Sequence, residues 1–395
     1  MRVLTGLEVF LESPPKWLDG LRIGLLCNPA SVDSRFRHAR DCIAERFPGQ
    51  LTALFSPQHG FDAEKQDNMV ESDHGIDPTL GIPIFSLYGE TRIPTTDMLR
   101  HIDVLVIDLL DVGTRVYTFI YTMSYCLEAA AAHGIRVLIL DRPNPIGGDT
   151  IEGNVLEPES ASFVGRFPIP MRHGMTMGEL ALMFNEMGNI GCRIDVVPMR
   201  GWKRSMVFQD TGLPWVPPSP NMPSPTTALV YPGQVLWEGT NVSEGRGTTL
   251  PFECFGAPFI DHKALDIDPR AFPGVVLRPI AFEPVSNKWQ GTLCRGYHIH
   301  VTDRTRFRPY ATSLHILQRI LLAFPEAFSW KSPPYEYETV RMPIDLIIGS
   351  RTVRQSIEAG RDIDALTKQW QEALEAYDRF RSSFLLYPRE QETTR

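Results

Sequence analysis

Five short apolar runs divide the first 145 residues, and each ends in a group of polar side chains. Runs of this length that consist almost entirely of Val, Ile and Leu are typical of strands buried on both faces of a parallel sheet. In such sheets, ligands bind in the crevice beyond the carboxyl ends of the strands. The polar residues that follow the runs are therefore expected to meet at one pocket. The predicted strands are Arg22–Cys27, Leu51–Phe55, Ile82–Leu87, Asp103–Asp108 and Arg136–Leu140.

Helix-like segments separate these runs. An amphipathic segment covers Arg35–Phe47, and an Ala-rich segment covers Phe119–His133, with Gly134 as its C-cap. A third helix is predicted over Gly178–Met187 and a further strand over Arg193–Val197. Strands that alternate with helices in this way indicate an α/β fold, with a doubly wound, mainly parallel sheet and right-handed crossovers.

The composition changes from about Thr211 to Pro232, and over residues 213–225 prolines are too frequent for a regular helix or strand. The segment is either a loose linker or an extended stretch fixed against the surface, and its Trp215 and Met222 favour the second. We predict a first domain over residues 1–210, a connection over 211–232 and a smaller domain of helices and strands over 233–395. The elements predicted for the smaller domain are strands Val275–Phe282 and Tyr297–Val301 and helices Ala311–Phe324 and Ile363–Phe384.

The bulk composition is ordinary for a soluble globular protein. Of the 395 residues, 43% are hydrophobic and 22% are charged, and the formal net charge of -8 comes without a basic block, so nucleic acid is not an expected partner. No run of about 18 apolar residues and no secretory signal is seen, which predicts no membrane association and a cytoplasmic location. The six cysteines have no zinc-like or redox spacing and are expected to be buried free thiols. The oligomeric state is open, and a homodimer is one alternative.

Polar residues after the second and third strands are the first candidates for catalysis. His59 follows a strand and suits proton transfer or a hydrogen bond to a sugar, although it could simply cap the next turn. Glu90 could act as a general acid if a partly closed crevice raises its pKa, and Arg92 could bind an anionic group. The alternative for Glu90 and Arg92 is a surface ion pair.

The next two strand ends add further candidates. Asp108 and Asp111 lie close together in sequence and, near Glu90, would supply the acid and base of a hydrolysis. Asp111 could instead only pair with Arg115. Asn144 stands between two prolines, where it could bind a sugar hydroxyl or an amide, or simply complete a turn.

A charged, glycine-rich loop over residues 237–248 contains Glu238, Glu244 and Arg246, which could form a second wall of the crevice. A structural connection is the alternative. The chain has no P-loop motif, and no G-x-G-x-x-G follows the first strand, so nicotinamide or flavin binding is disfavoured and no cofactor is expected. No metal is expected either, because no spacing such as H-E-x-x-H occurs. The absence of G-x-S-x-G argues against the α/β-hydrolase mechanism.

Taken together, these motifs resemble those of the exo-β-N-acetylmuramidase family, long known as a domain of unknown function. The resemblance extends from about Gly6 to the carboxyl terminus. It implies a Rossmann-like first domain, a smaller second domain and a site in the cleft between them. The motifs are Cys27-Asn28-Pro29-Ala30, Ser56-Pro57-Gln58-His59-Gly60-Phe61, Ser86-Leu87-Tyr88-Gly89-Glu90-Thr91-Arg92, the run from Asp108 to Arg115, Leu140-Asp141-Arg142-Pro143-Asn144-Pro145 and the run from Glu238 to Thr248.

The activity implied by this resemblance is the release of terminal N-acetylmuramic acid, or of a related amino sugar, from peptidoglycan fragments, without a cofactor. The anionic lactyl group of that sugar would give Arg92, Arg115 or Arg246 a ligand. The partner is therefore expected to be a small carbohydrate. The expected catalytic residues are Glu90, Asp108, Asp111 and His59, and the expected substrate-binding residues are Asn28, Gln58, Arg92, Arg115, Asn144, Glu238, Glu244 and Arg246.

One departure from the family motifs bears on catalysis. Members typically carry a Glu immediately before the His-Gly pair, a residue suspected to be catalytic, whereas this chain has Gln58, which cannot act as an acid or a base. The chain thus resembles a divergent branch in which Glu90 would be the acid and Asp108 or Asp111 the base. At least two of these carboxylates are then expected to face one cavity. The alternative is a non-hydrolytic amino-sugar-binding protein, and a cofactor-dependent oxidoreductase is disfavoured by the missing glycine fingerprint.

Overall fold

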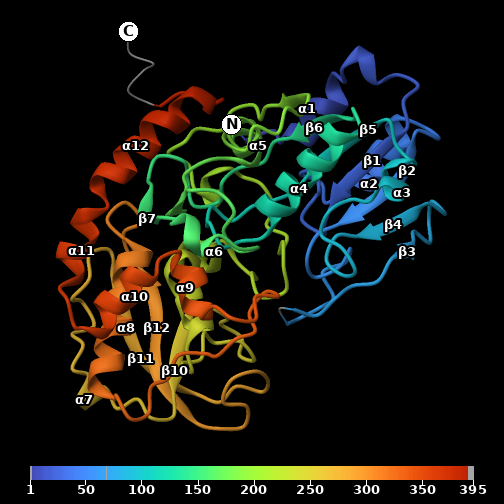
Figure 1. Cartoon of the computed structure of the whole chain (residues 1–395). Helices are drawn as coiled ribbons and strands as arrows, with labels where there is room; N and C mark the ends of the chain where they lie inside the picture. The colour runs from blue at the N-terminus through green and yellow to red at the C-terminus, as the bar shows by residue number, and fades with distance from the viewer. Residues whose placement is uncertain (1, 68, 390–395) are drawn as a thin grey trace.

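A sheet of seven strands, in the order β3-β4-β2-β1-β5-β6-β9, forms the centre of the first part of the chain (Figure 1). The computed structural model describes residues 2–67 and 69–389. Neighbouring strands are parallel except for the short edge strand β3, which is antiparallel to β4. Without β3, the order is that of the Rossmann sheet, and the predicted fold class is confirmed. The strands are β1 Ile23–Cys27, β2 Leu51–Ser56, β3 Gly75–Ile76, β4 Pro83–Ser86, β5 Val104–Asp108, β6 Arg136–Leu140 and β9 Ile194–Val197.

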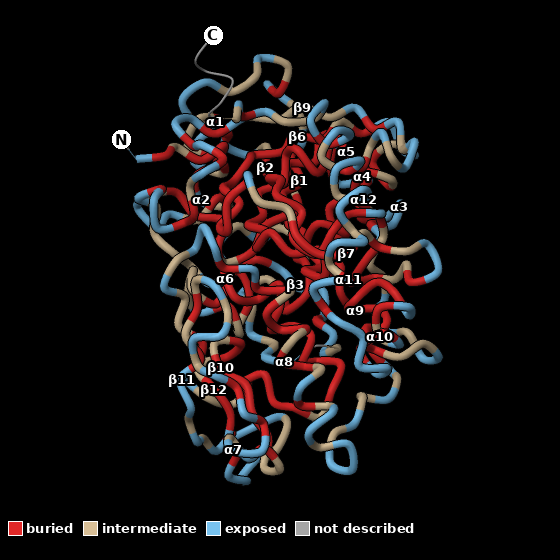
Figure 2. The backbone as a smooth tube through the Cα atoms, turned by 90° about the vertical axis from the view of Figure 1, so that its left-hand side faces the viewer, coloured by how far each residue is buried: buried red, intermediate tan, exposed pale blue. Residues whose placement is uncertain are grey.

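Helices cover both faces of this sheet. Successive strand residues enter different hydrophobic clusters, so that Leu25 packs with helices α1 and α2 and Leu26 packs with α4 and α5. Figure 2 shows β1, β2 and β6 as buried segments of the interior. Because both faces are buried, the central strands β1, β2, β5 and β6 are largely hydrophobic, which explains why the sequence predicts them well. The helices of this part are α1 Gly6–Glu12, α2 Ala39–Arg46, α3 Thr96–Leu99, α4 Phe119–Ala132 and α5 Met177–Met187.

A smaller antiparallel sheet of three strands, in the order β10-β12-β11, lies in the second part of the chain. Helices α6 and α8 pack together beside it. Their approach requires Gly233, since a Cβ there would lie 2.0 Å from the carbonyl oxygen of Pro309. The strands are β10 Cys254–Ala257, β11 Val275–Phe282 and β12 Cys294–Val301, and the helices are α6 Pro225–Gln234, α7 His262–Leu265, α8 Pro309–Ala323, α9 Pro343–Ile348 and α10 Arg351–Glu358.

The structure differs from the sequence prediction in several elements. Helix α2 begins at Ala39 instead of Arg35, because the His38 side chain caps it by accepting from the backbone N–H of Arg40. The long helix expected at the end of the chain is two helices, α11 Ile363–Gln369 and α12 Gln371–Arg381, with a break at Trp370. A two-stranded ribbon, β7 Glu152–Val155 and β8 Pro170–Arg172, was not predicted.

The Pro-rich connection is fixed to the molecule. Met222 is buried, and its carbonyl oxygen accepts a hydrogen bond of 3.2 Å from the indole of Trp215. The Asn28 side chain, just after β1, donates to the carbonyl of Pro218 at 3.0 Å. The segment therefore lies over the carboxyl edge of the large sheet, as its Trp and Met residues indicate, before it enters α6.

The end of the chain returns to the large sheet. Helices α11 and α12, red in Figure 1, run along one side of the molecule toward the first part of the chain. Beyond them, the hydroxyl of Tyr387 donates to Asp141 at the end of β6, at 2.6 Å, and accepts from the backbone N–H of Met199 at 2.9 Å. The predicted domain limits of 1–210, 211–232 and 233–395 stay a prediction.

Two expectations from composition can be compared with the structure. All six cysteines are free and buried, as predicted. Within residues 2–67 and 69–389, we find no helix with the length and apolar character needed to cross a membrane.

Asp141 gives a prediction for the pH dependence of stability. Burial raises its pKa to about 7, against the opposing effect of hydrogen bonds from Tyr387, Gly178 and Thr176. The folded protein therefore keeps this proton up to about pH 7, whereas an unfolded Asp releases it near pH 4, so the free energy of unfolding falls as the pH rises through this window. The asparagine of Asp141→Asn cannot ionise. The free energy of unfolding of this variant, compared with that of wild type, should therefore rise by about 2–4 kcal/mol as the pH increases from 4.5 to 7.5.

Urea unfolding at both pH values measures this difference. Asp19→Asn, which changes an exposed carboxyl, is the matched control and should show no such trend. A constant difference between Asp141→Asn and wild type across the window would show that Asp141 ionises normally in the folded protein.

Candidate active site

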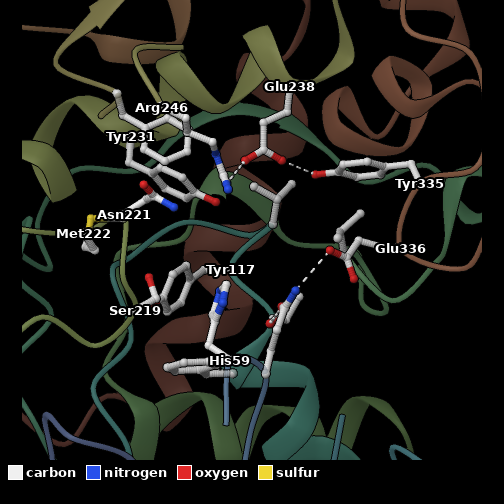
Figure 3. Close-up of a pocket in the computed structure, with 16 residues that line it drawn as sticks. His59, Tyr117, Ser219, Asn221, Met222, Tyr231, Glu238, Arg246, Tyr335 and Glu336 are labelled. Atoms are coloured by element: carbon white, nitrogen blue, oxygen red, sulfur yellow. Dashed lines mark hydrogen bonds and ion pairs between the residues drawn. The ribbon is translucent and has the colours of Figure 1, made fainter. Parts of the chain in front are cut away.

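A cavity lies between the carboxyl edge of the large sheet and the second part of the chain (Figure 3). Its walls come from several separate stretches of sequence. Gln58 and His59 follow β2, residues 116–119 follow β5, residues 219–222 belong to the Pro-rich connection, and the remaining walls come mainly from residues beyond α6. The expectation that distant loops meet at this edge is confirmed.

A buried carboxyl group, Glu336, lies in this cavity with Gln58. The Gln58 amide donates to Oε1 of Glu336 at 3.1 Å, and the hydroxyl of Tyr88 donates to Oε2 at 2.7 Å. The hydroxyl of Thr118 in turn donates to the Gln58 carbonyl oxygen at 2.7 Å and fixes the orientation of the amide. Glu336 is 5% exposed, and burial raises its pKa although the hydrogen bonds from Tyr88 and Gln58 oppose the rise. This is a carboxyl that retains its proton more readily than one in water.

His59 contributes a neutral imidazole. Its Nδ1 lies 2.7 Å from the carbonyl oxygen of Lys65, which can only accept a hydrogen bond, so Nδ1 carries the hydrogen. Burial lowers the pKa of His59 to about 4, and the ring is uncharged near neutral pH. Nε2 therefore has a lone pair and, among the described residues, no hydrogen-bond partner. It can accept a hydrogen bond from a sugar hydroxyl or from water.

A second carboxylate, Glu238, faces the cavity from the glycine-rich loop. Its two oxygens accept hydrogen bonds of 2.6 Å from Arg246 and from the hydroxyl of Tyr335. Behind this pair, Glu244 lies 3.3 Å from Arg246 and 2.8 Å from Lys288. Although burial acts in the opposite direction, the charges of Lys288 and Arg246 lower the pKa of Glu244. The predicted second wall is therefore a network of ion pairs that fixes Glu238 in place.

Three predicted catalytic carboxylates do not line the cavity. Glu90 is exposed. Asp108 is buried in an ion pair with Arg142 at 2.7 Å, and Asp111 contacts Nε2 of His173 at 3.0 Å. The expectation that two of these carboxylates face one cavity is not met. The loop that follows β5 is buried throughout. Its Asp111 and Arg115 contact neighbouring segments of the chain, whereas residues 116–118 line the cavity.

Most of the other predicted binding residues hold loops together. Arg115 is fully buried and donates to backbone carbonyls from three elements, among them Asn154 at 2.9 Å and Ile347 at 3.1 Å. Asn144 donates to the carbonyl of Met175 at 3.0 Å, and Asn28 holds the Pro-rich connection. None of these three side chains lines the cavity.

Arg92 lies beside the cavity. Its guanidinium carbon is 3.6 Å from the ring centroid of Tyr337 and 4.7 Å from that of Phe163. The residue therefore supports the loop that carries Glu336 through cation–π contacts. Of the twelve residues predicted for the site, four line the cavity, namely Gln58, His59, Glu238 and Arg246.

The sequence interpretation missed Glu336, Tyr335 and Tyr88. Glu336 lies in an irregular loop, with left-handed φ angles of 46° at Glu336 and 68° at Tyr337, so no strand end marks it. The available signal was the alternation of aromatic and acidic residues in Tyr335-Glu336-Tyr337-Glu338, next to two prolines. Tyr88 was part of a motif but received no role.

Among residues 2–67 and 69–389, no cluster of three or more His, Cys, Asp or Glu side chains is able to hold a metal ion.

A Rossmann-like sheet with two carboxyl groups facing one cavity defines an α/β protein equipped for glycoside hydrolysis. The chain belongs to the exo-beta-N-acetylmuramidase NamZ family, since the N-terminal model of that family matches residues 23–226 and the C-terminal model matches residues 229–387. The resemblance seen in the motifs is thus confirmed.

Similar proteins cover nearly the whole chain. The peptidoglycan beta-N-acetylmuramidase NamZ of Bacillus subtilis (strain 168) is 45% identical over 390 residues, which are 98% of this chain and 92% of that protein. A solved DUF1343 family protein from Bacteroides fragilis superimposes with a TM-score of 0.87 and 34% identity, over 98% of this chain and 99% of the other. A second protein of that family and organism gives a TM-score of 0.77 and 29% identity, over 99% and 100% of the two chains.

Proposed function

We propose that this protein is an exo-acting glycoside hydrolase that releases terminal N-acetylmuramic acid, or a closely related amino sugar, from peptidoglycan fragments. The family membership and the similarity to a peptidoglycan beta-N-acetylmuramidase support the substrate class. The observation that carries the mechanism is the buried carboxyl of Glu336, held between Gln58 and Tyr88 in the same cavity as Glu238.

Glu336 is the general acid of this proposal. A glycosidic oxygen must gain a proton as its bond to the sugar breaks, and a carboxyl with a raised pKa can supply it near neutral pH. Gln58 cannot transfer a proton, so its part is to orient Glu336 through the amide hydrogen bond. In this proposal the proton donor is therefore Glu336, in the loop beyond α8, and not the residue before His59.

Glu238 is the second carboxylate. As the bond breaks, the sugar ring acquires oxocarbenium character, and a carboxylate held by Arg246 and Tyr335 can stabilise that positive charge without reorganising. His59 Nε2 is available to accept a hydrogen bond from the sugar or from the attacking water. Glu244 acts one step further away, by fixing Arg246.

The buried lining of the cavity supports exo action. Tyr117, Phe119 and Val164 are buried and line it. A site lined by buried side chains suits the end of a glycan better than a chain that passes through. The cytoplasmic location predicted from the sequence suits an enzyme of cell wall recycling that receives small fragments.

Glu336→Gln compared with Glu90→Gln tests the proposal. Removing the acid should lower kcat/KM for a chromogenic β-N-acetylmuraminide by at least about 100-fold, while Glu90→Gln, at an exposed position, should stay within about twofold of wild type. Loss of activity in Glu90→Gln with activity retained in Glu336→Gln would instead assign catalysis to the strand-end carboxylate. Calorimetric binding of the sugar by a wild type without turnover would favour the alternative, an amino-sugar-binding protein, which Gln58 also permits.

Gln58→Glu tests the relation between Gln58 and Glu336. A second carboxyl 3.1 Å from Glu336 would share its proton and raise the pKa at which the last proton is lost. Because the proposed acid must be protonated, the alkaline limb of the kcat/KM profile should move to higher pH by about one unit. The exposed substitution Gln209→Glu adds the same charge elsewhere and should leave the profile unchanged. An unshifted alkaline limb in Gln58→Glu would show that Glu336 is not the group whose protonation limits the rate.

A further inference from the structure

Beside the cavity is a second hollow, which shares Glu238 and Arg246 with it. Its other walls include Glu244, Lys288 and Lys331. Because both spaces border the same Glu238–Arg246 pair, a substituent that leaves the cavity beside this pair enters the hollow.

Most charges of the hollow neutralise one another. The ammonium of Lys288 donates to the carbonyls of Trp237 at 2.7 Å and Val242 at 3.1 Å, and to Glu244 at 2.8 Å, which uses all three of its hydrogens. Arg246 is ion-paired with both Glu238 and Glu244. These four side chains form a closed set of two cations and two anions.

Lys331 is the exception. Its backbone N–H donates to the carbonyl of Gly239 at 2.9 Å, which fixes the start of the side chain. The half-buried ammonium lies 5.6 Å from the ring centroid of Tyr335 and, within residues 2–67 and 69–389, has no hydrogen bond or ion pair. The nearby rim carboxylate, Asp67, is exposed and accepts a hydrogen bond from Asn287. Lys331 therefore offers three donors and a positive charge to a bound anion.

We propose that Lys331 binds the lactyl carboxylate of N-acetylmuramic acid and so selects this sugar over N-acetylglucosamine. The two sugars differ only in the lactic acid joined by an ether at C3, and the carboxylate is the one charge that distinguishes them. This inference rests on the proposed function for the identity of the sugar.

The other cations considered for this role are already occupied. Arg115 is fully buried on backbone carbonyls, and Arg246 is held by Glu238 and Glu244. Arg92 is stacked on Tyr337 outside the cavity. Lys331 has its charge available and lies next to Tyr335, whose hydroxyl fixes the carboxylate of Glu238. Recognition of the carboxylate would thus take place directly beside the reacting bond.

The test compares a chromogenic β-N-acetylmuraminide with its lactyl methyl ester, which keeps the shape and removes the charge. Wild type should favour the acid in kcat/KM by about 10-fold or more, as expected for a charge-assisted hydrogen bond. Lys331→Met should lose this preference and treat acid and ester within about twofold of each other. Lys331→Arg should keep part of it.

Lys263→Met, at an exposed position on α7, is the matched control and should keep the wild-type preference. Thermal unfolding of each variant verifies that it is folded. An acid preference that survives in Lys331→Met, or a wild type without any preference, overturns the proposal.

Calorimetry with free N-acetylmuramic acid and its methyl ester separates this proposal from the hydrolytic one. A wild type that hydrolyses neither glycoside but binds the acid more tightly than the ester, with the preference lost in Lys331→Met, supports Lys331 and contradicts the hydrolytic function. Equal binding of acid and ester by wild type contradicts Lys331 whether or not the glycoside is hydrolysed.

Discussion

A carboxyl group removed from water is tolerated only where hydrogen bonds replace its hydration, and for Glu336 these bonds come from the other half of the chain. Its partners, Gln58 and Tyr88, follow neighbouring strands of the large sheet. The observed position of the Glu336 loop therefore depends on the edge of the sheet. The site belongs to neither half alone, because Glu336 and the side chains that donate hydrogen bonds to it are about 250 residues apart in sequence.

The residues around this edge divide into those that face the cavity and those that shape it. Asp108, Asp111 and Arg115 belong to one family-like motif, yet they bind Arg142, His173 and backbone carbonyls, respectively. Buried polar groups of this kind cost free energy where they are not paired. The bonds that they do make hold the loop after β5, and that loop carries Tyr117 and Thr118 into the cavity wall. The motif therefore serves the geometry of the site more than its chemistry.

The sequence predicted the central strands of the sheet well because they are covered on both faces and are largely hydrophobic. It also predicted that loops meet at the edge of the sheet where the cavity lies. It could not tell how deeply each strand-end loop is covered, so Asp108 and Asp111 looked as available as Gln58 and His59. Glu336 was not predicted because its loop has no periodicity. Its position depends on contacts with Tyr88 and Gln58 that no local sequence pattern encodes. The break at Trp370 was missed for a similar reason, since an amphipathic pattern continues through it.

The return of the last helices to the first sheet limits how the molecule can be divided. A cut between residues 226 and 229, where the two family models meet, leaves Tyr387 on the second fragment and Asp141 on the first. Each fragment would then expose a surface made to fit the other. The two halves are for this reason poorly suited to use as independent modules.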